Sequence, residues 1–348
     1  MRPALRLPLL AAGFVALFAG VGAGLARLGW TLPGASLAGV HGPLMICGFF
    51  ATVISLERAV ALGKRWPYLA PIASALGALA LVSAQPLAAQ LLFLLAGAAL
   101  VAACVSIYTR QPALHSLVPV LGAACLTAGG ALWLAGPGVA AAVPWWIAFL
   151  VLTIAGERLE LSRLLPRPPA AARVFALVVA AIVASLAVSL ALPLAGRAAL
   201  GAATLALAAW LVRYDVARRT LRGRELPRFV AVCLLSGYAW LAAGAVFLAC
   251  SPWLPGFARD AGLHAILLGF VFSMVFGHAP IIFPAVTGAA MAYHWSFYVP
   301  LALLQASLAV RVAGDFGVLG AWRAAGGAGS AAALALFVAG TAAAVARG

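Results

Sequence analysis

Long apolar stretches occupy almost all of the 348-residue chain, and they restrict the fold more than any other feature. A helix needs about 20 apolar residues to cross the hydrocarbon core of a bilayer. Twelve stretches approach or exceed that length, although the third is short. The sequence therefore predicts an all-α polytopic membrane protein, with residues 1–348 in a single transmembrane domain. We expect spans near residues 7–27, 41–62, 69–84, 86–107, 117–136, 139–163, 171–194, 197–215, 228–250, 263–287, 295–314 and 326–346.

The composition excludes a soluble globular domain and argues against nucleic-acid binding. Hydrophobic residues make up 66% of the chain and charged residues 8%, whereas a soluble domain carries about 25% charged residues. The net charge of +15 comes mostly from alternate loops, and cytoplasmic loops carry such an excess. We therefore expect a multi-pass protein of the inner (cytoplasmic) membrane with both termini in the cytoplasm. The basic residues between positions 213 and 228 are expected to contact anionic lipid headgroups of the bilayer.

A short pattern recurs in spans two, six and ten. Glu57-Arg58 and Glu157-Arg158 fall at equivalent positions, and His278 takes the place of the glutamate in span ten. Because these spans are four helices apart, the pattern predicts three four-helix repeats, over residues of about 1–110, 111–220 and 221–348. The alternative is a general helical bundle in which small residues allow close packing.

Two histidines open spans two and ten in the same way. His41 and His264 both stand where the chain is expected to enter the membrane from outside. Intramembrane histidines are rare and indicate a cofactor or a proton path, and a neutral imidazole is a good axial ligand for haem iron. Gly42, Gly48 and Gly269 would leave room for a flat macrocycle. The alternative is that both histidines are interfacial and bind loop carbonyls or water.

A second polar site is expected at the other membrane face. Glu57, Glu157 and His278 suit a proton relay or a metal ion, with His278 as a possible ligand. Equally, Glu57 and Arg158 could form one ion pair and Glu157 and Arg58 another, which would make these residues structural clamps between helices.

Span ten also contains prolines and a nearby charged pair. Pro280 and Pro284 follow His278 and predict a kinked or broken helix. In span eleven, Arg311 and Asp315 stand four residues apart, which predicts a local ion pair. If a haem lies at that end, Arg311 or Arg259 could hold a propionate instead.

Twelve spans with histidines opening the second and tenth resemble the catalytic subunit of the haem-copper oxidases. In that family, histidines of these two helices hold a low-spin haem, so the resemblance implies that His41 and His264 hold a haem here. Span six lacks the copper-ligand histidine of that family, and span seven lacks its His-His pair. Oxygen reduction at a haem-copper centre is therefore not implied.

The stretch His264-Ala265 through Gly269-Phe270, with Met274, Gly277 and Thr287-Gly288, is similar to a histidine-bearing helix of the NnrS family. The members of that family have twelve spans and are linked to haem, copper and nitric oxide metabolism. The similarity implies haem b and, as a further cofactor, copper. The His-x-His-Glu cluster of that family's early helix is absent here, which puts copper in doubt.

Three functions follow from these patterns. The first is a haem b-binding membrane protein for electron transfer or for nitric oxide or another small gas, with a redox protein or a respiratory complex as partner. The second is a proton-coupled transporter that uses Glu57, Glu157 and His278, with the proline-interrupted span ten as its gate. The third is a non-catalytic subunit of a respiratory complex. No catalytic residue is identified.

Overall fold

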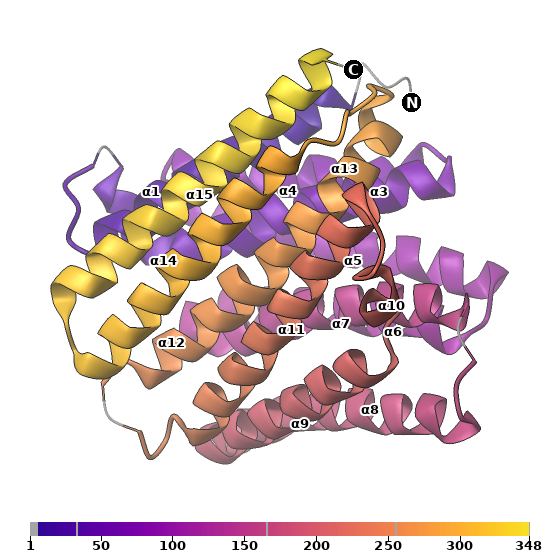
Figure 1. The fold of residues 1–348 in the computed structure, drawn as a ribbon. Helices are drawn as coiled ribbons and strands as arrows, with labels where there is room; N and C mark the ends of the chain where they lie inside the picture. Colours follow the sequence, from indigo (N-terminus) through magenta and orange to yellow (C-terminus); the bar gives the residue numbers. More distant parts are fainter. Residues whose placement is uncertain (1–5, 33, 165, 255, 348) are drawn as a thin grey trace. The chain divides into compact units, whose positions relative to one another are not determined.

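The computed structural model describes residues 6–32, 34–164, 166–254 and 256–347. Every regular element in these ranges is a helix (Figure 1). Within them, eleven helices are long and apolar enough to cross a membrane, and Trp66–Val82 is a shorter apolar helix. The predicted all-α polytopic membrane fold is therefore confirmed, and the short third stretch is the helix that falls below full spanning length.

The chain divides into two compact units. The first extends to Glu157 and includes Ala285–Gly288, and the second comprises residues 158–284 and 289–347. This division into two units does not test the three repeats expected from the sequence, which remain a prediction. In the first part of the chain the elements are α1 (Leu7–Arg27), η2 (Ala35–Val40), α2 (His41–Pro43), η3 (Leu44–Phe50), α3 (Ala51–Leu62), η4 (Trp66–Tyr68), α4 (Leu69–Val82), α5 (Pro86–Arg110), α6 (Leu114–Leu134) and α7 (Val139–Leu161).

The second part of the chain continues in the same style. Prolines begin several helices, such as Pro86 in α5 and Pro169 and Pro193 in the next two, because a first-turn residue needs no backbone N–H donor. The elements are η5 (Ser162–Leu164), α8 (Pro169–Ala191), α9 (Pro193–Tyr214), α10 (Ala217–Thr220), α11 (Glu225–Cys250), α12 (Ala258–His264), η6 (Ala265–Phe272), α13 (Ser273–Thr287), η7 (Trp295–Phe297), α14 (Tyr298–Gly317) and α15 (Gly320–Arg347).

Within the first unit, successive helices pack side by side. Helix α1 packs against η3, and α4, α5 and α6 form a consecutive series. The core of this unit is built around aromatic side chains: Trp133 and Trp146 meet edge to face, with ring centroids 5.8 Å apart, and Phe149 is fully buried. Leucines and other apolar side chains remain exposed on the helices, as lipid-facing surfaces require.

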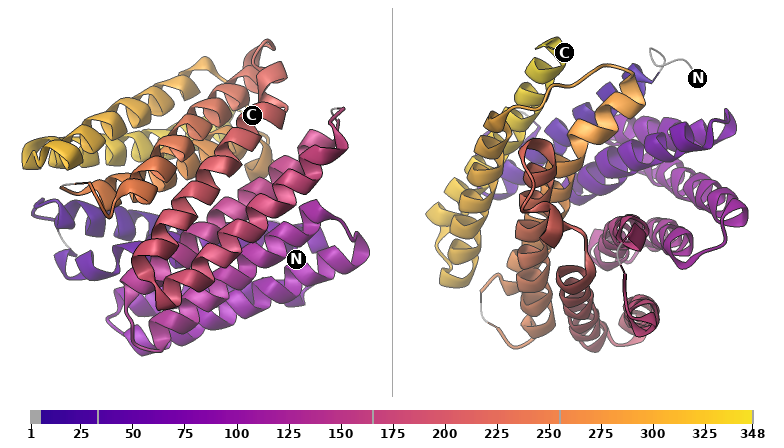
Figure 2. Two further views of the ribbon diagram at one scale, coloured as in Figure 1. Left: turned by 90° about the horizontal axis from the view of Figure 1, so that it is seen from below. Right: turned by 45° about the vertical axis from the view of Figure 1, so that its right-hand side comes forward.

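Within the second unit, α8 packs against α9, α9 against α11, and α11 against η6. Helices α14 and α15 run side by side along their length (Figure 2), and α14 also contacts α12 and η6. The helix that carries His264 therefore lies between α11 and α14 in this unit, which brings polar side chains of α14 toward it.

The helix that begins at His41 changes geometry within its first turns. Helix α2 passes into a π-helical segment, η3, and α geometry returns in α3. Such segments contain one extra residue per turn and recur at functional sites. Hydroxyl groups cover its carbonyls: Ser74 donates to Cys47 O at 2.5 Å. Thr52 Oγ1 lies 2.6 Å from Gly48 O and 2.8 Å from Ser74 Oγ, and shares its proton between them.

The helix that carries His264 is built in the same way. His264 ends α12, the π-helical segment η6 follows, and α13 begins at Ser273. Ser273 accepts a hydrogen bond from Gln305 Nε2 at 2.9 Å, and Gln305 Oε1 accepts one from Trp240 Nε1 at 2.5 Å. In each unit, a histidine thus precedes a π segment and a buried hydroxyl follows it.

The predicted break at the prolines of span ten is not found. Helix α13 runs from Ser273 to Thr287 with Pro280 and Pro284 inside it. The departure from α-helical geometry lies in η6, before the prolines. A proline removes one backbone hydrogen bond without ending a membrane helix, because neighbouring groups can satisfy the freed carbonyl.

Candidate functional site

His41 is held against α1 through one ring nitrogen. Its Nδ1 lies 2.6 Å from the carbonyl oxygen of Gly20. A carbonyl oxygen only accepts hydrogen bonds, so we assign the proton to Nδ1 and the lone pair to Nε2. The half-buried ring lies over Gly24, where an added Cβ would stand 2.8 Å from His41 Cε1. Only glycine fits there, so α1 provides both the acceptor and the space for this imidazole.

His264 shows the same arrangement within its own helix. Its Nδ1 lies 2.9 Å from the carbonyl oxygen of Asp260 and 3.5 Å from Asp260 Oδ1. Arg311 Nη2 also approaches Nδ1, at 3.4 Å, but the carbonyl is nearer. Because both Asp260 oxygens are acceptors, we assign the proton to Nδ1 and the lone pair to Nε2, as in His41.

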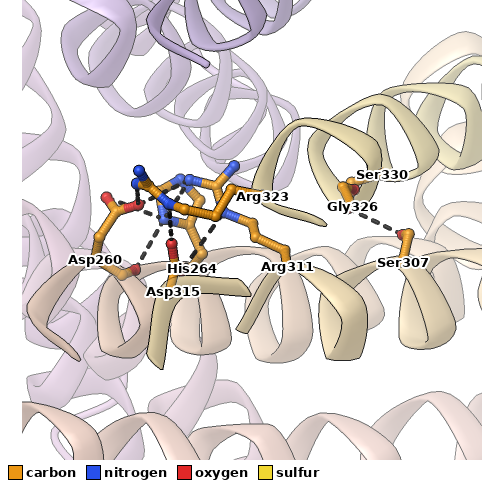
Figure 3. A network of polar contacts seen from close by, with 8 residues as sticks. All are labelled: Asp260, His264, Ser307, Arg311, Asp315, Arg323, Gly326 and Ser330. Atoms are coloured by element: carbon orange, nitrogen blue, oxygen red, sulfur yellow. Dashed lines mark hydrogen bonds and ion pairs between the residues drawn. The ribbon is translucent and has the colours of Figure 1, made fainter. Parts of the chain in front are cut away.

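His264 borders a network of four charged side chains, drawn in Figure 3. Asp260 Oδ2 accepts from Arg311 Nη2 at 2.9 Å and from Arg323 Nη2 at 3.3 Å. Arg323 Nε donates to Asp315 Oδ1 at 2.5 Å. The side chain of Asp315 is 0% exposed and that of Arg311 8%. Two guanidinium groups thus neutralise two carboxylates, which is the condition for keeping them buried.

This network confirms the expected ion pair of Arg311 with Asp315 and extends it to Asp260 and Arg323. Arg311 Nε and Asp315 Oδ2 approach only to 4.0 Å, and each residue makes its shorter contact elsewhere, with Asp260 and Arg323 respectively. Arg311 and Arg323 are therefore neutralised by carboxylates within the protein. A propionate-binding role for Arg311 is not supported by this geometry.

Two glycines allow α14 and α15 to approach closely enough to form the network. A Cβ on Gly314 of α14 would stand 2.7 Å from the backbone nitrogen of Arg323, and one on Gly326 of α15 would stand 2.5 Å from that of Arg311. Each arginine thus lies opposite a glycine of the other helix. The two backbones are close enough here that any larger residue would separate the helices, and with them the two arginines that bind Asp260.

A second charged cluster lies within the same unit. Arg158 binds Asp215 through two hydrogen bonds, from Nε to Oδ2 at 2.7 Å and from Nη2 to Oδ1 at 2.9 Å. Its remaining nitrogen, Nη1, lies 3.3 Å from His278 Nε2, and His278 Nδ1 lies 2.8 Å from Met274 O. His278 therefore carries its proton on Nδ1 and accepts from Arg158 through Nε2.

The structure also locates the predicted clamp residues. Arg58 donates to Glu157 in an ion pair of the first unit, which is one of the two pairs that the sequence suggested. The partner of Arg158 is Asp215, a residue that the sequence reasoning missed. Glu57 lies half-buried on α3. The signal for Asp215 was its rarity, because Asp and Glu together number only 7.

Two of the three glycines expected to admit a macrocycle are covered by neighbouring side chains, whereas a Cβ on the third, Gly42, would stand 3.7 Å from Val139 Cγ1. An added Cβ on Gly48 would stand 3.0 Å from Ala16 Cβ, and one on Gly269 would stand 2.4 Å from Trp240 Cβ. These two glycines serve close helix packing.

A metal ion held by protein side chains alone needs several donor groups close together. No three His, Cys, Asp or Glu side chains gather for this purpose in the part of the chain that the structure describes. A haem differs from such a centre, because it needs only one or two axial ligands from the protein.

Comparison with known proteins identifies the family without adding a function. A search of curated proteins finds no match. A family model described as "Domain of unknown function (DUF8744)" matches residues 6–346, which is nearly the whole chain. The chain therefore belongs to the DUF8744 family.

Proposed function

We propose that this chain is a haem b-binding protein of the membrane, in which His41 and His264 are each candidate ligands of haem iron through Nε2. The observation that carries the proposal is their matched construction. Each imidazole directs Nδ1 to a backbone carbonyl, at 2.6 and 2.9 Å. His264 stands directly before a π-helical segment, and His41 stands three residues before the first residue of another.

The donor set suits the cofactor. Histidines that bind metals almost always donate their other ring N–H to a carbonyl or carboxylate, which fixes the tautomer and the ring orientation. Gly20 O and Asp260 supply such acceptors. Haem b would supply one-electron redox chemistry or a site for a diatomic gas. The protein would hold each imidazole in its neutral, Nδ1-protonated form.

The number of axial ligands separates the two uses of the haem. An iron with two histidine ligands is saturated and transfers electrons, whereas an iron with one can bind a gas such as nitric oxide. In the first case the protein requires a redox partner, which we propose to be a soluble electron carrier or a respiratory complex. The distribution of basic residues favours the inner membrane with both termini in the cytoplasm.

The transporter alternative receives less support from the geometry. A proton added to His278 Nε2 would place a second cation 3.3 Å from the Arg158 guanidinium, which like-charge repulsion opposes. Glu157 is already paired with Arg58. These contacts favour a structural role for Arg58, Glu157, Arg158 and His278.

Absorption spectroscopy of the detergent-purified full chain tests the proposal. Protein expressed with ample haem should show reduced-minus-oxidised α and Soret bands, and pyridine haemochrome analysis should identify haem b. His41→Ala and His264→Ala should each lower or shift these bands. His294→Ala is the matched control, because His294 lies exposed before η7 with Nδ1 2.8 Å from Ser296 Oγ.

Two results would overturn the proposal. The first is a colourless, correctly folded preparation from haem-replete cells. The second is an unchanged spectrum in the double variant that lacks both histidines. Size-exclusion elution of each variant checks that a lost band reflects lost ligation and not unfolding.

A further inference from the structure

The carboxylate of Asp260 has an unusual position beside a candidate haem ligand. Its Oδ1 lies 3.5 Å from His264 Nδ1, while the carbonyl of the same residue lies 2.9 Å from that nitrogen. Asp260 stands one helical turn before His264, so the carboxylate and the imidazole share one face of α12. A single residue thus offers the imidazole N–H two acceptors, one neutral and one charged.

The carboxylate is also held in place. Its other oxygen, Oδ2, accepts from Arg311 at 2.9 Å and from Arg323 at 3.3 Å. The side chain of Arg311 is 8% exposed and that of Arg323 18%, and Arg323 lies over the Phe257 ring, with its Cζ 3.6 Å from the ring centroid. Because Oδ2 is occupied by the arginines, Oδ1 remains turned toward His264, as Figure 3 shows.

A negative charge beside the imidazole N–H changes what the opposite nitrogen can do. The carboxylate, 3.5 Å from Nδ1, offsets the positive charge of Arg311, whose Nη2 lies 3.4 Å from the same nitrogen. With the carboxylate present, Nε2 is more basic and a stronger donor to a metal than it would be beside the arginine alone. A more basic axial ligand stabilises ferric over ferrous iron, and so does the added negative charge. Both effects act in the same direction and lower a reduction potential.

We propose that Asp260 is a positioning residue that lowers the reduction potential of a haem bound through His264, and that Arg311 and Arg323 fix its carboxylate for this purpose. The inference rests on the proposed function, because it requires a haem at His264. It adds a residue and a regulated property that neither the histidine pair nor the family membership assigns.

Asp315 provides a matched control inside the same network. It carries the same charge and binds the same Arg323, at 2.5 Å, but its carboxylate is directed to the two arginines. Asp260→Asn and Asp315→Asn therefore remove equal charge from one cluster. They differ in whether the removed charge belongs to the carboxylate beside His264.

Potentiometric titration of the haem-loaded, detergent-purified protein tests the proposal. Loss of a group that orients a metal ligand changes affinity about 10- to 100-fold. We expect Asp260→Asn to favour ferrous haem by about tenfold, which for a one-electron couple is a rise of about 59 mV. Asp315→Asn should change the ferrous-to-ferric ratio less than threefold. The electron paramagnetic resonance signal of ferric haem should change in Asp260→Asn alone.

Equal shifts in the two Asn variants would overturn the proposal, because they would show that only the charge of the cluster acts. No shift in Asp260→Asn would do the same. If that variant does not fold, Asp260→Glu, which keeps the charge but displaces it by one methylene, should shift the potential more than Asp315→Asn. If Asp260→Glu shifts the potential less than Asp315→Asn does, the proposal is wrong. A wild-type protein without haem would instead count against the proposed function, so the two failures are distinguishable.

Discussion

Removal of the Asp215 charge should destabilise the second unit strongly. Arg158 and Asp215 are paired by two hydrogen bonds, with side chains only 3% and 0% exposed. Asp215→Asn keeps the shape of the residue, and its Oδ1 can still accept from Ala217 N, the contact that starts α10. The variant therefore removes the negative charge and replaces the Oδ2 acceptor of Arg158 Nε by an NH2 group, which cannot accept that hydrogen bond.

The cost follows from the burial of the guanidinium. An isolated buried charge is far more costly than a buried pair, and breaking such a pair costs about 3–5 kcal/mol. Arg158 also contacts His278 Nε2 at 3.3 Å and the buried Tyr238, but both side chains are neutral and neither can replace a carboxylate. At 1.4 kcal/mol for each tenfold change, the unfolding equilibrium should shift more than about a hundredfold.

This cost can be measured by unfolding the protein with increasing mole fractions of SDS in mixed micelles. Tryptophan fluorescence and far-ultraviolet circular dichroism follow the transition. Glu160→Gln is the matched control, because it removes one charge from the Arg163–Glu160 pair, in which both side chains are 47% exposed. Such pairs contribute about 0–1 kcal/mol. The double variant Arg158→Met, Asp215→Asn should cost less than the sum of its single variants, by about 0.5–3 kcal/mol.

A loss for Asp215→Asn as small as that for Glu160→Gln would refute the reasoning. It would show that water or detergent headgroups reach the guanidinium and compensate it. Strict additivity in the double-variant cycle would lead to the same conclusion, because two groups that stabilise each other cannot have independent costs.

Three further predictions concern packing, a polar chain and thiol reactivity. Gly269→Val should destabilise the protein by about 1–3 kcal/mol or more, because its Cβ would stand 2.4 Å from Trp240 Cβ. Gly340→Ala is the control: an added Cβ there would have no atom within 4 Å, so the variant should be neutral or stabilising in the same SDS titration. Gln305→Leu should lower the free energy of unfolding by about 1–3 kcal/mol, because Trp240 Nε1 and Ser273 Oγ would lose their hydrogen bonds to Gln305. If Gln305→Leu is no less stable than Gln305→Asn, this prediction is wrong. Maleimide should label Cys250 first in the folded protein, because the other four cysteines are buried; mass spectrometry of the Cys250→Ser variant should then show little labelling.

The membrane class of the fold was predictable because it depends on local properties of the chain. A run of apolar residues is a candidate span wherever its neighbours lie, and a helix is the structure that satisfies its own backbone in hydrocarbon. The predicted first span, residues 7–27, coincides with α1, and the other predicted ranges follow the later helices in order, although residues 171–194 extend from α8 into the start of α9. The sequence also indicated that the third span is short, and the corresponding helix, Trp66–Val82, falls below full spanning length.

The candidate site was predictable only in part. The sequence singled out His41, His264 and His278 because ionisable residues are conspicuous among apolar ones. It gave no reason to choose a ring nitrogen, and it placed Arg158 with Glu57. The structure instead joins Arg158 to a carboxylate 57 positions later in the chain.

The sequence by itself thus determined the all-helical membrane class and the residues that would be costly in hydrocarbon, because both follow from the chemistry of short segments. The tertiary structure alone decided which charges meet and which glycines bring helices together, because a salt bridge depends on distances between helices. Asp260 illustrates the difference: its spacing from His264 can be read in the sequence, but Arg311 and Arg323 reach it only after α14 and α15 have packed.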